Sequence, residues 1–323
     1  MSVNLTEVIA TTLAHDSGKA ADNVTNSNAL LWKLKDMGRI TTAGGGYELR
    51  EQLLYNELAT KFYDGFETFT IDTSQEVVDA AVYQWKQLGG FSFISGKEKN
   101  MNREKWQIVN IANARIKALI AGLENKTGLS LYSLGTGEGG KEFGGLRLLV
   151  SDDGAGTVGG INASTYAWWQ NQNDVAAGTL VTANIQTRMN AMQLATTRGK
   201  DQADLIVADA TFFTAYWESL QANARFTNSK MADAGFRTLE FVGAPVCYDP
   251  QCATDLTATG TGRMYFLNTK YLQFQKAAGR FFSTEEARKV ENADYDVIPN
   301  WTMGNLTTDG RFLHGVIGND GSA

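Results

Sequence analysis

Residues 135–172 read GTGEGGKEFGGLRLLVSDDGAGTVGGINASTYAWWQNQ, a stretch in which two glycine tracts flank a short apolar run and lead to paired tryptophans. Glycine loses more conformational entropy on folding than any other residue and contributes no side chain to a core. A chain tolerates glycine at this density where backbones pass close to one another or adopt positive φ. Trp168 and Trp169 are large apolar anchors, suited to fixing a loop against a body or a neighbouring subunit.

The first glycine tract partly matches a phosphate-binding loop. Residues 135–141 satisfy the first seven positions of a P-loop, but Glu142 stands where a Ser or Thr would hold Mg²⁺. The next residues, Phe-Gly-Gly at 143–145, are not expected to open the helix whose N-terminus would bind the anion. The pattern favours a flexible connection over a nucleotide site. A soluble ligand-binding protein or enzyme that uses 135–141 is the alternative from a different functional class.

Composition excludes several classes of protein. The 323 residues are 43% hydrophobic and 20% charged, enough for one large or two medium cores. A net charge of −6 without long charged blocks argues against electrostatic nucleic-acid binding, which needs clustered Lys and Arg. No apolar run approaches membrane-spanning length, and the N-terminus lacks the apolar core of a signal peptide. We therefore expect no membrane partner and no export through a classical signal.

The residues that usually carry catalysis or bind metals are scarce. Cys247 and Cys252 are the only cysteines, whereas a structural zinc site needs four ligands. A disulfide between them is disfavoured in a reducing cytoplasm, so they are interpreted as small apolar side chains beside a turn. His15 and His314 are the only histidines, and no nucleophile-elbow or zinc-protease motif occurs. We assign no catalytic, cofactor-binding or metal-ligating residue and expect that the protein is not an enzyme.

The first part of the chain shows two helical patterns, then alternation, then a long helical pattern. Alternating apolar and polar residues predict half-buried strands, which as an isolated hairpin would be only marginally stable without a partner surface. The predicted elements are helices at 5–14 and at 29–37 (capped by Thr25 or Asn26 and ended by Gly38), strands at 66–72 and 77–94, and a helix at 100–125 with Asn102 as its N-cap and Gly128 beyond its end.

Beyond the tryptophans the pattern becomes α/β. The Asp before the second helix can serve as its N-cap. The predicted elements are a helix at 179–197, a buried strand at 204–208, a helix after Asp209 that runs to 220, and strands at 239–246, 264–268, 297–303 and 311–317.

This order of elements resembles the major capsid proteins of tailed bacteriophages, which have the Hong Kong 97-type fold. Three segments resemble the family in amino-acid sequence as well: GGINASTYAWWQNQ at 159–172, DLIVADATFF at 204–213 and MYFLNTKY at 264–271. The resemblance implies an α+β fold that is divided into an N-terminal arm at 1–44, an extended β loop at 45–98, a peripheral domain with a spine helix at 99–154, an α/β axial domain at 155–294 that partly returns to the peripheral domain, and returning peripheral strands with the C-terminus at 295–323.

The resemblance also implies a function. Such a subunit assembles with copies of itself into hexamers and pentamers, through the extended loop and the N-terminal arm. The icosahedral or prolate shell encloses the double-stranded DNA genome in the virion, after assembly in the cytoplasm of the host bacterium. The implied partners are scaffolding, portal and decoration proteins and non-specifically contacted DNA, and no cofactor. The nearer alternative is an encapsulin-like compartment subunit, which shares the fold and packages a cargo protein.

Some members of the family crosslink neighbouring subunits through Lys–Asn isopeptide bonds. Four lysines lie on or beside the expected extended loop: Lys61, Lys86, Lys97 and Lys99. Nothing in the sequence marks one of them as reactive, so they are interpreted as ordinary surface lysines.

Overall fold

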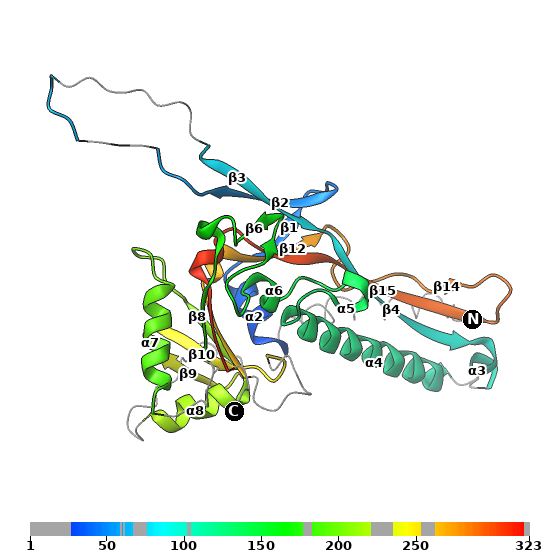
Figure 1. Ribbon diagram of the computed structural model, residues 1–323. Helices are drawn as coiled ribbons and strands as arrows, with labels where there is room; N and C mark the ends of the chain where they lie inside the picture. The colour runs from blue at the N-terminus through cyan, green and yellow to red at the C-terminus, as the bar shows by residue number, and fades with distance from the viewer. Residues whose placement is uncertain are drawn as a thin grey trace.

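The computed structural model describes residues 27–58, 60, 62–66, 76–101, 105–176, 183–220, 235–252 and 262–319. Two six-stranded sheets form the body of the molecule. A long helix runs beside the first sheet, and a hairpin projects far away from the body (Figure 1). The helix expected at 5–14 and, except for its first residue, the strand expected at 66–72 lie outside the described residues.

The helices vary widely in length. They are α2 (Ala29–Asp36), α3 (Gly96–Met101), α4 (Lys105–Leu131), α5 (Gly137–Gly140), α6 (Leu146–Leu149), α7 (Ile185–Ala195) and α8 (Ala210–Ser219), with 3₁₀ turns η1 (Ala167–Trp169), η2 (Thr269–Tyr271) and η3 (Arg311–Leu313).

Each sheet draws strands from distant parts of the chain. The first sheet contains β1 (Ile40–Ala43), β4 (Lys86–Ser95), β12 (Leu272–Ala277), β13 (Ser283–Thr284), β14 (Arg288–Lys289) and β15 (Tyr295–Thr308). The second runs in the order β7 (Gln172–Ala176), β16 (Gly315–Asn319), β11 (Arg263–Leu267), β8 (Leu205–Ala208), β10 (Ala244–Tyr248) and β9 (Thr238–Phe241). Two hairpins stand apart: β2 (Glu48–Leu54) with β3 (Val78–Gln84), and β5 (Thr157–Val158) with β6 (Ile161–Asn162).

The second sheet has the α/β character that the sequence predicted. All four residues of β8 are buried, as expected for a strand covered on both faces. Asp209 follows β8, and its side chain accepts a hydrogen bond from the backbone N–H of Phe212 at 2.9 Å, which caps α8. Helices α7 and α8 contribute Met189 and Phe212 to the core on one side of this sheet. The predicted strand and capped helix are confirmed here.

The first sheet is organised around β15, a strand of 14 residues. One edge of β15 pairs with β4 over ten residues, from Tyr295 opposite Ser95 to Gly304 opposite Lys86, and the other edge pairs with β12, β13 and β14. Helix α4 packs on β4 at Gly90, where an added Cβ would lie 2.5 Å from Leu119 Cδ1. Glycine at this position therefore allows the close approach of helix and strand.

Several predicted boundaries were wrong because long-range packing overrides local signals. Helix α4 continues past Gly128, since Leu131 at its end is fully buried in the main core. The N-cap of α2 is Asn28, whose side chain accepts from the N–H of Leu31 at 3.1 Å. The single strand expected at 239–246 is the pair β9–β10, joined by a tight turn in which Val242 and the next residue both have positive φ.

Two predicted runs are divided between different parts of the fold. The run at 77–94 changes direction at Trp85, so β3 pairs with β2 while β4 joins the first sheet. The C-terminal runs, expected to return together, also separate: β15 lies in the first sheet, but β16 lies in the second, between β7 and β11. The turn at 308–310 and η3 make this crossing possible within a few residues.

Candidate assembly site

The hairpin β2–β3 and the loop that joins its strands, here called the arm, extend away from the body (Figure 1). The strands pair from Glu48 opposite Gln84 to Leu54 opposite Val78. Near the body, alternate β2 residues are buried, whereas beyond Leu54 the described side chains are exposed apart from the half-buried Tyr55 and Val77. The arm therefore has an anchored root and a free outer part.

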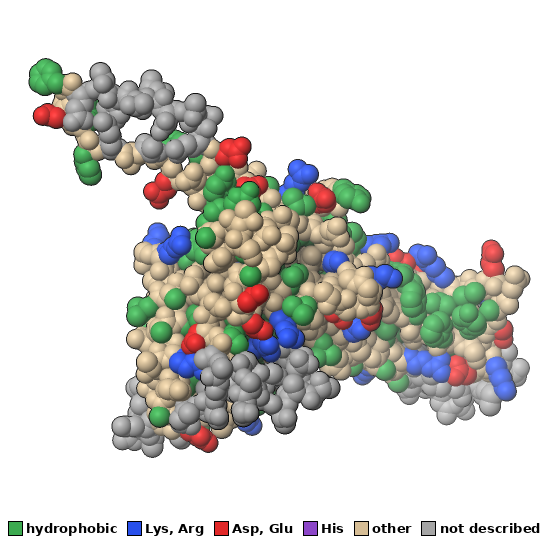
Figure 2. Space-filling view, viewed as in Figure 1, with side chains coloured by type: hydrophobic (Ala, Val, Ile, Leu, Met, Phe, Trp, Pro, Cys, Tyr) green, Lys and Arg blue, Asp and Glu red, His purple; other side chains and the backbone are tan. Residues whose placement is uncertain are grey.

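The outer part of the arm carries large apolar side chains that the subunit leaves in solvent. Leu54 and Val78 are 78% and 65% exposed, and Phe62 and Phe66 are fully exposed. Figure 2 shows apolar side chains at the far end of this projection. Burying a Leu or Phe side chain contributes about 1.5–3 kcal/mol, so a surface of this kind marks an interaction site.

The second glycine tract approaches the arm at its root. The N–H of Val82 in β3 donates to the carbonyl of Gly159 at 2.9 Å. Gly159 has φ +60°, and an added Cβ would lie 2.7 Å from the Cβ of Ala81. This position therefore needs glycine both for its conformation and for its contact with β3. The sequence-based interpretation of glycine as a site of close backbone approach is confirmed here.

The paired tryptophans divide their roles. Trp169 is 1% exposed, and its Nε1 donates to the carbonyl of Val158 at 3.0 Å, which fixes the β5–β6 loop to the body. Trp168 stacks on Tyr55 of the arm, with ring centroids 4.6 Å apart and planes 14° apart. The loop is thus anchored on one side and supports the arm on the other.

A fully buried arginine holds this loop in place. The guanidinium of Arg311 donates to the carbonyls of Leu149, Ala155 and Trp169 and to the hydroxyl of Ser151, at 2.7–3.3 Å. Its partners span the region between α6 and η1, so one side chain connects the start and the end of the loop. Burial lowers the pKa of Arg311 to about 10, which leaves it charged at neutral pH.

Gly159→Ala tests the close approach of this loop to the arm. The substitution places a Cβ against Ala81 and also strains a positive φ, so we expect the variant to lose about 2–4 kcal/mol of unfolding free energy. Gly160→Ala is the matched control, because Gly160 has φ +79° and nothing within 4 Å of an added Cβ. Urea denaturation should show a loss of only about 1–2 kcal/mol for the control. Equal losses would contradict the role of the Ala81 contact.

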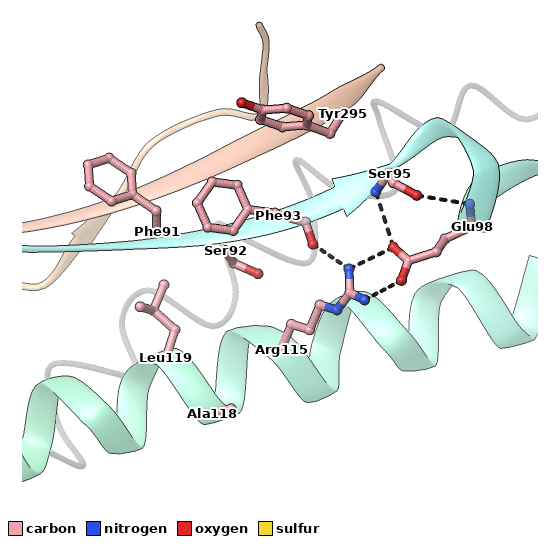
Figure 3. A pocket seen from close by; sticks show the side chains of 9 residues that line it. All are labelled: Phe91, Ser92, Phe93, Ser95, Glu98, Arg115, Ala118, Leu119 and Tyr295. Carbon is pink, nitrogen blue, oxygen red and sulfur yellow. Dashed lines mark hydrogen bonds and ion pairs between the residues drawn. The ribbon is translucent and has the colours of Figure 1, made fainter. Parts of the chain in front are cut away.

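A second exposed apolar surface lies where β15 begins, near Tyr295. A groove of about 670 Å³ lies between β4, α4 and the start of β15, and aromatic side chains line it (Figure 3). Phe91 and Phe93 are about half exposed, and Phe93 packs edge-to-face on Tyr295 at 5.9 Å. Among the described strands β4 pairs only with β15, so no described strand covers its other edge beside this groove.

An ion pair closes one end of the groove (Figure 3). Arg115 of α4 contacts Glu98 at 2.5 Å and donates to the backbone carbonyl of Phe93. Glu98 also accepts from the N–H of Ser95 at 3.1 Å. The hydrogen bond with Arg115, followed by that with Ser95, lowers the pKa of Glu98 to about 2. These contacts connect the end of β4 to α4.

The first glycine tract lacks the features of a phosphate site. Helix α5 contains left-handed residues, including Glu138 at φ 52°, and two nearby lysines are engaged by the loop itself. Lys126 pairs with Glu138, and Lys86 donates to the carbonyl of Gly140. Contrary to expectation, the glycines at 144–145 do open a helix, with Gly145 as the N-cap of α6, but α6 has only four residues. The structure therefore favours the interpretation as a connection.

The cysteines, lysines and possible metal ligands noted in the sequence do not form a reactive or metal-binding site among the described residues. Cys247 and Cys252 are buried, as interpreted, and are not joined by a disulfide, and burial raises the pKa of the Cys247 thiol to about 12. No metal-binding group of three or more His, Cys, Asp or Glu occurs among the described residues, and none of their helices is long and apolar enough to span a membrane. Lys97 is exposed, whereas Lys61 and the side chain of Lys99 lie outside the described part.

His314 gives the fold a dependence on pH. It is fully buried, its Nδ1 accepts from the N–H of Asn268 at 3.3 Å, and its Nε2 lies 3.1 Å from Thr308 Oγ1. Burial lowers its pKa to about 4, below the usual 6.5. The folded state therefore binds fewer protons than the unfolded state between these values, so stability is full above about pH 6.5 and falls toward pH 4.

We expect His314→Gln to remove this part of the pH dependence. The wild-type protein should lose about 3 kcal/mol from this group between pH 7 and pH 4, and the variant should not. Urea unfolding of unassembled protein at both pH values measures the difference. Identical pH slopes for the two proteins would show that His314 does not contribute.

Comparison with solved structures identifies the fold. No family model and no curated protein matches the chain. Among solved structures, the capsid asymmetric unit of cyanophage A-1(L) matches with a TM-score of 0.66 and 15% identity, over 87% of this chain and 89% of that chain. The capsid of a native GTA particle matches at 0.59 and 10%, over 91% and 90%. The capsid of Myoviridae phage XM1 matches at 0.54 and 15%, over 88% and 91%. At these identities, the likenesses show a shared α+β fold.

Proposed function

We propose that this chain, whose fold is the Hong Kong 97-type fold, is the major capsid protein of a tailed phage. In this function it assembles into hexamers and pentamers that form the head shell. The observation that carries the proposal is the arm, a projection whose exposed aromatic side chains the subunit itself does not cover. A neighbouring copy in a closed shell would cover them.

The arrangement of the sheets suggests how the expected domains map onto the structure. The first sheet with α4 would form the peripheral domain and α4 its spine helix. The second sheet with α7 and α8 would form the axial domain, to which β16 contributes at the end of the chain. The extended loop would be the arm at 48–84, shorter than the 45–98 expected from sequence, because β4 lies in the first sheet.

The contents and partners of the shell belong to the same proposal. The shell would enclose double-stranded DNA in the virion and assemble in the host cytoplasm, with scaffolding, portal and decoration proteins. A net charge of −6 suits a wall along which packaged DNA slides without sticking. The role is structural, and no residue is proposed to be catalytic.

Size-exclusion chromatography of the expressed protein, with negative-stain imaging of each peak, tests this proposal. We expect capsomers, tubes or closed shells, alone or after co-expression with a scaffolding protein. A clean monomer over a wide range of concentration and salt, with and without scaffold, would contradict it.

A further inference from the structure

A buried acidic residue connects the root of the arm to the first sheet. Glu51 lies in the middle of β2 and is only 8% exposed. Its Oε1 accepts a hydrogen bond from Thr307 Oγ1 of β15 at 2.7 Å and further hydrogen bonds from the side-chain amides of Gln273 and Gln275 of β12. One carboxylate oxygen thus gathers three donors from two strands.

The other strand of the arm, β3, also contacts β15, one residue further along it. Tyr83 of β3 is buried, and its hydroxyl donates to the carbonyl of Thr308 at 2.9 Å. The two strands of the hairpin therefore bind consecutive residues, Thr307 and Thr308, where β15 ends. Both contacts lie on the side of the arm that faces the body.

Apolar contacts alone would leave the direction of the arm poorly defined. Leu49 and Leu53, which flank Glu51 on the same face of β2, are buried in the main core. Such contacts are non-directional and survive small shifts of one element over another. Hydrogen bonds require defined distances and angles, and a buried carboxylate that loses its donors is strongly unfavourable. The described ion pairs do not include Glu51, so neutral donors alone satisfy it there.

We propose that Glu51 is a positioning residue that fixes the direction of the arm on the first sheet, while the flanking leucines hold the root in place. The consequence for assembly rests on the proposed function: a shell subunit must present its arm at a defined angle to a neighbour. The contact with Gln273, Gln275 and Thr307 therefore contributes specificity of arm direction rather than stability of the subunit.

Distance measurements on the unassembled subunit test this inference. Spin labels on Val78→Cys in the arm and Leu194→Cys on α7 occupy exposed positions, whereas the native cysteines are buried. We expect a narrow distribution of distances in the Glu51 protein. Glu51→Leu combined with Gln275→Leu and Thr307→Val should broaden it by about twofold without lowering the urea midpoint, because apolar side chains then replace the whole buried hydrogen-bonded group and no longer select one position.

The matched control is Arg50→Leu, the neighbouring residue on the exposed face of β2, which should leave the distribution unchanged. Glu51→Met with the same two changes at Gln275 and Thr307 also leaves no buried charge, so it should broaden the distribution equally, and it replaces the leucine variant if that protein fails to fold. An unchanged width, or a broadening that appears only with a lower urea midpoint, would overturn the inference. Since no shell is needed for this measurement, its outcome is independent of whether the protein assembles.

Discussion

Removing the outer arm is expected to abolish assembly and to leave the subunit folded. Leu54 and Val78 lie directly opposite each other in the β2–β3 ladder, so an Asn-Gly turn can join them in place of residues 55–77. The deletion removes Phe62 and Phe66, which are fully exposed and make no contribution to the core of the subunit. It also removes Tyr55, and with it the stacking of that ring on Trp168 at the root.

The size of the effect follows from the apolar surface that a neighbour would cover. Burial of two or three Leu and Phe side chains contributes roughly 4 kcal/mol or more for each arm contact, which corresponds to about a thousandfold in association. Light scattering or negative stain should therefore show no shells at concentrations at which the wild-type protein assembles. Circular dichroism should show an unchanged fold.

Point substitutions distinguish the effect of the apolar side chains from the effect of loop length. Leu58→Asp with Phe62→Asp should prevent assembly as the deletion does, because it places charges in an apolar interface. Glu57→Gln with Asp64→Asn, on the same segment, is the matched control and should assemble normally. Assembly of the shortened protein at wild-type concentration would show that the outer arm is not an interface.

The order of the elements could be predicted from the sequence because each element has a local signature. The buried run of β8 and the cap at Asp209 are adjacent, and α4 follows from helical periodicity. The division at Trp85 could not be predicted, because both halves of 77–94 alternate in the same way and only their partners differ. Strand partners more than two hundred residues away leave no trace in a local pattern.

The two residues that anchor the arm and its supporting loop, Glu51 and Arg311, differ in how far the sequence could have predicted them. Glu51 could have been suspected, since alternation places it on the same face of β2 as Leu49 and Leu53. That alternation is a local signal for the burial of Glu51. Arg311 offers none: its partners lie 142–162 residues away, and a charged residue after a turn is typical of a surface. β3 was predicted as part of the run at 77–94, whereas its partner β2 and the residues that hold the arm were not.

Arg311→Met is expected to cause a large loss of unfolding free energy. Methionine fills much of the volume but leaves the carbonyls of Leu149 and Trp169 without their donor, and Ala155 keeps only the hydroxyl of Ser151. Each buried group that loses its partner costs about 1–3 kcal/mol, so we expect a total loss of roughly 4 kcal/mol or more. For a domain of marginal stability this is a large fraction of the folding free energy.

A comparison of three substitutions shows whether the charge of Arg311 or the geometry of its donors stabilises the loop. Arg311→Lys keeps the charge but cannot present donors in the planar fork that reaches both ends of the loop, so its urea midpoint should lie between those of the methionine variant and the wild type. Arg288→Met is the surface control: its ion pair with Glu285 is exposed and should contribute at most about 1 kcal/mol. If Arg311→Met and Arg288→Met had equal midpoints, the loop would not depend on this guanidinium. If the lysine variant matched the wild type, charge rather than the bridging of the two loop ends would be the stabilising property.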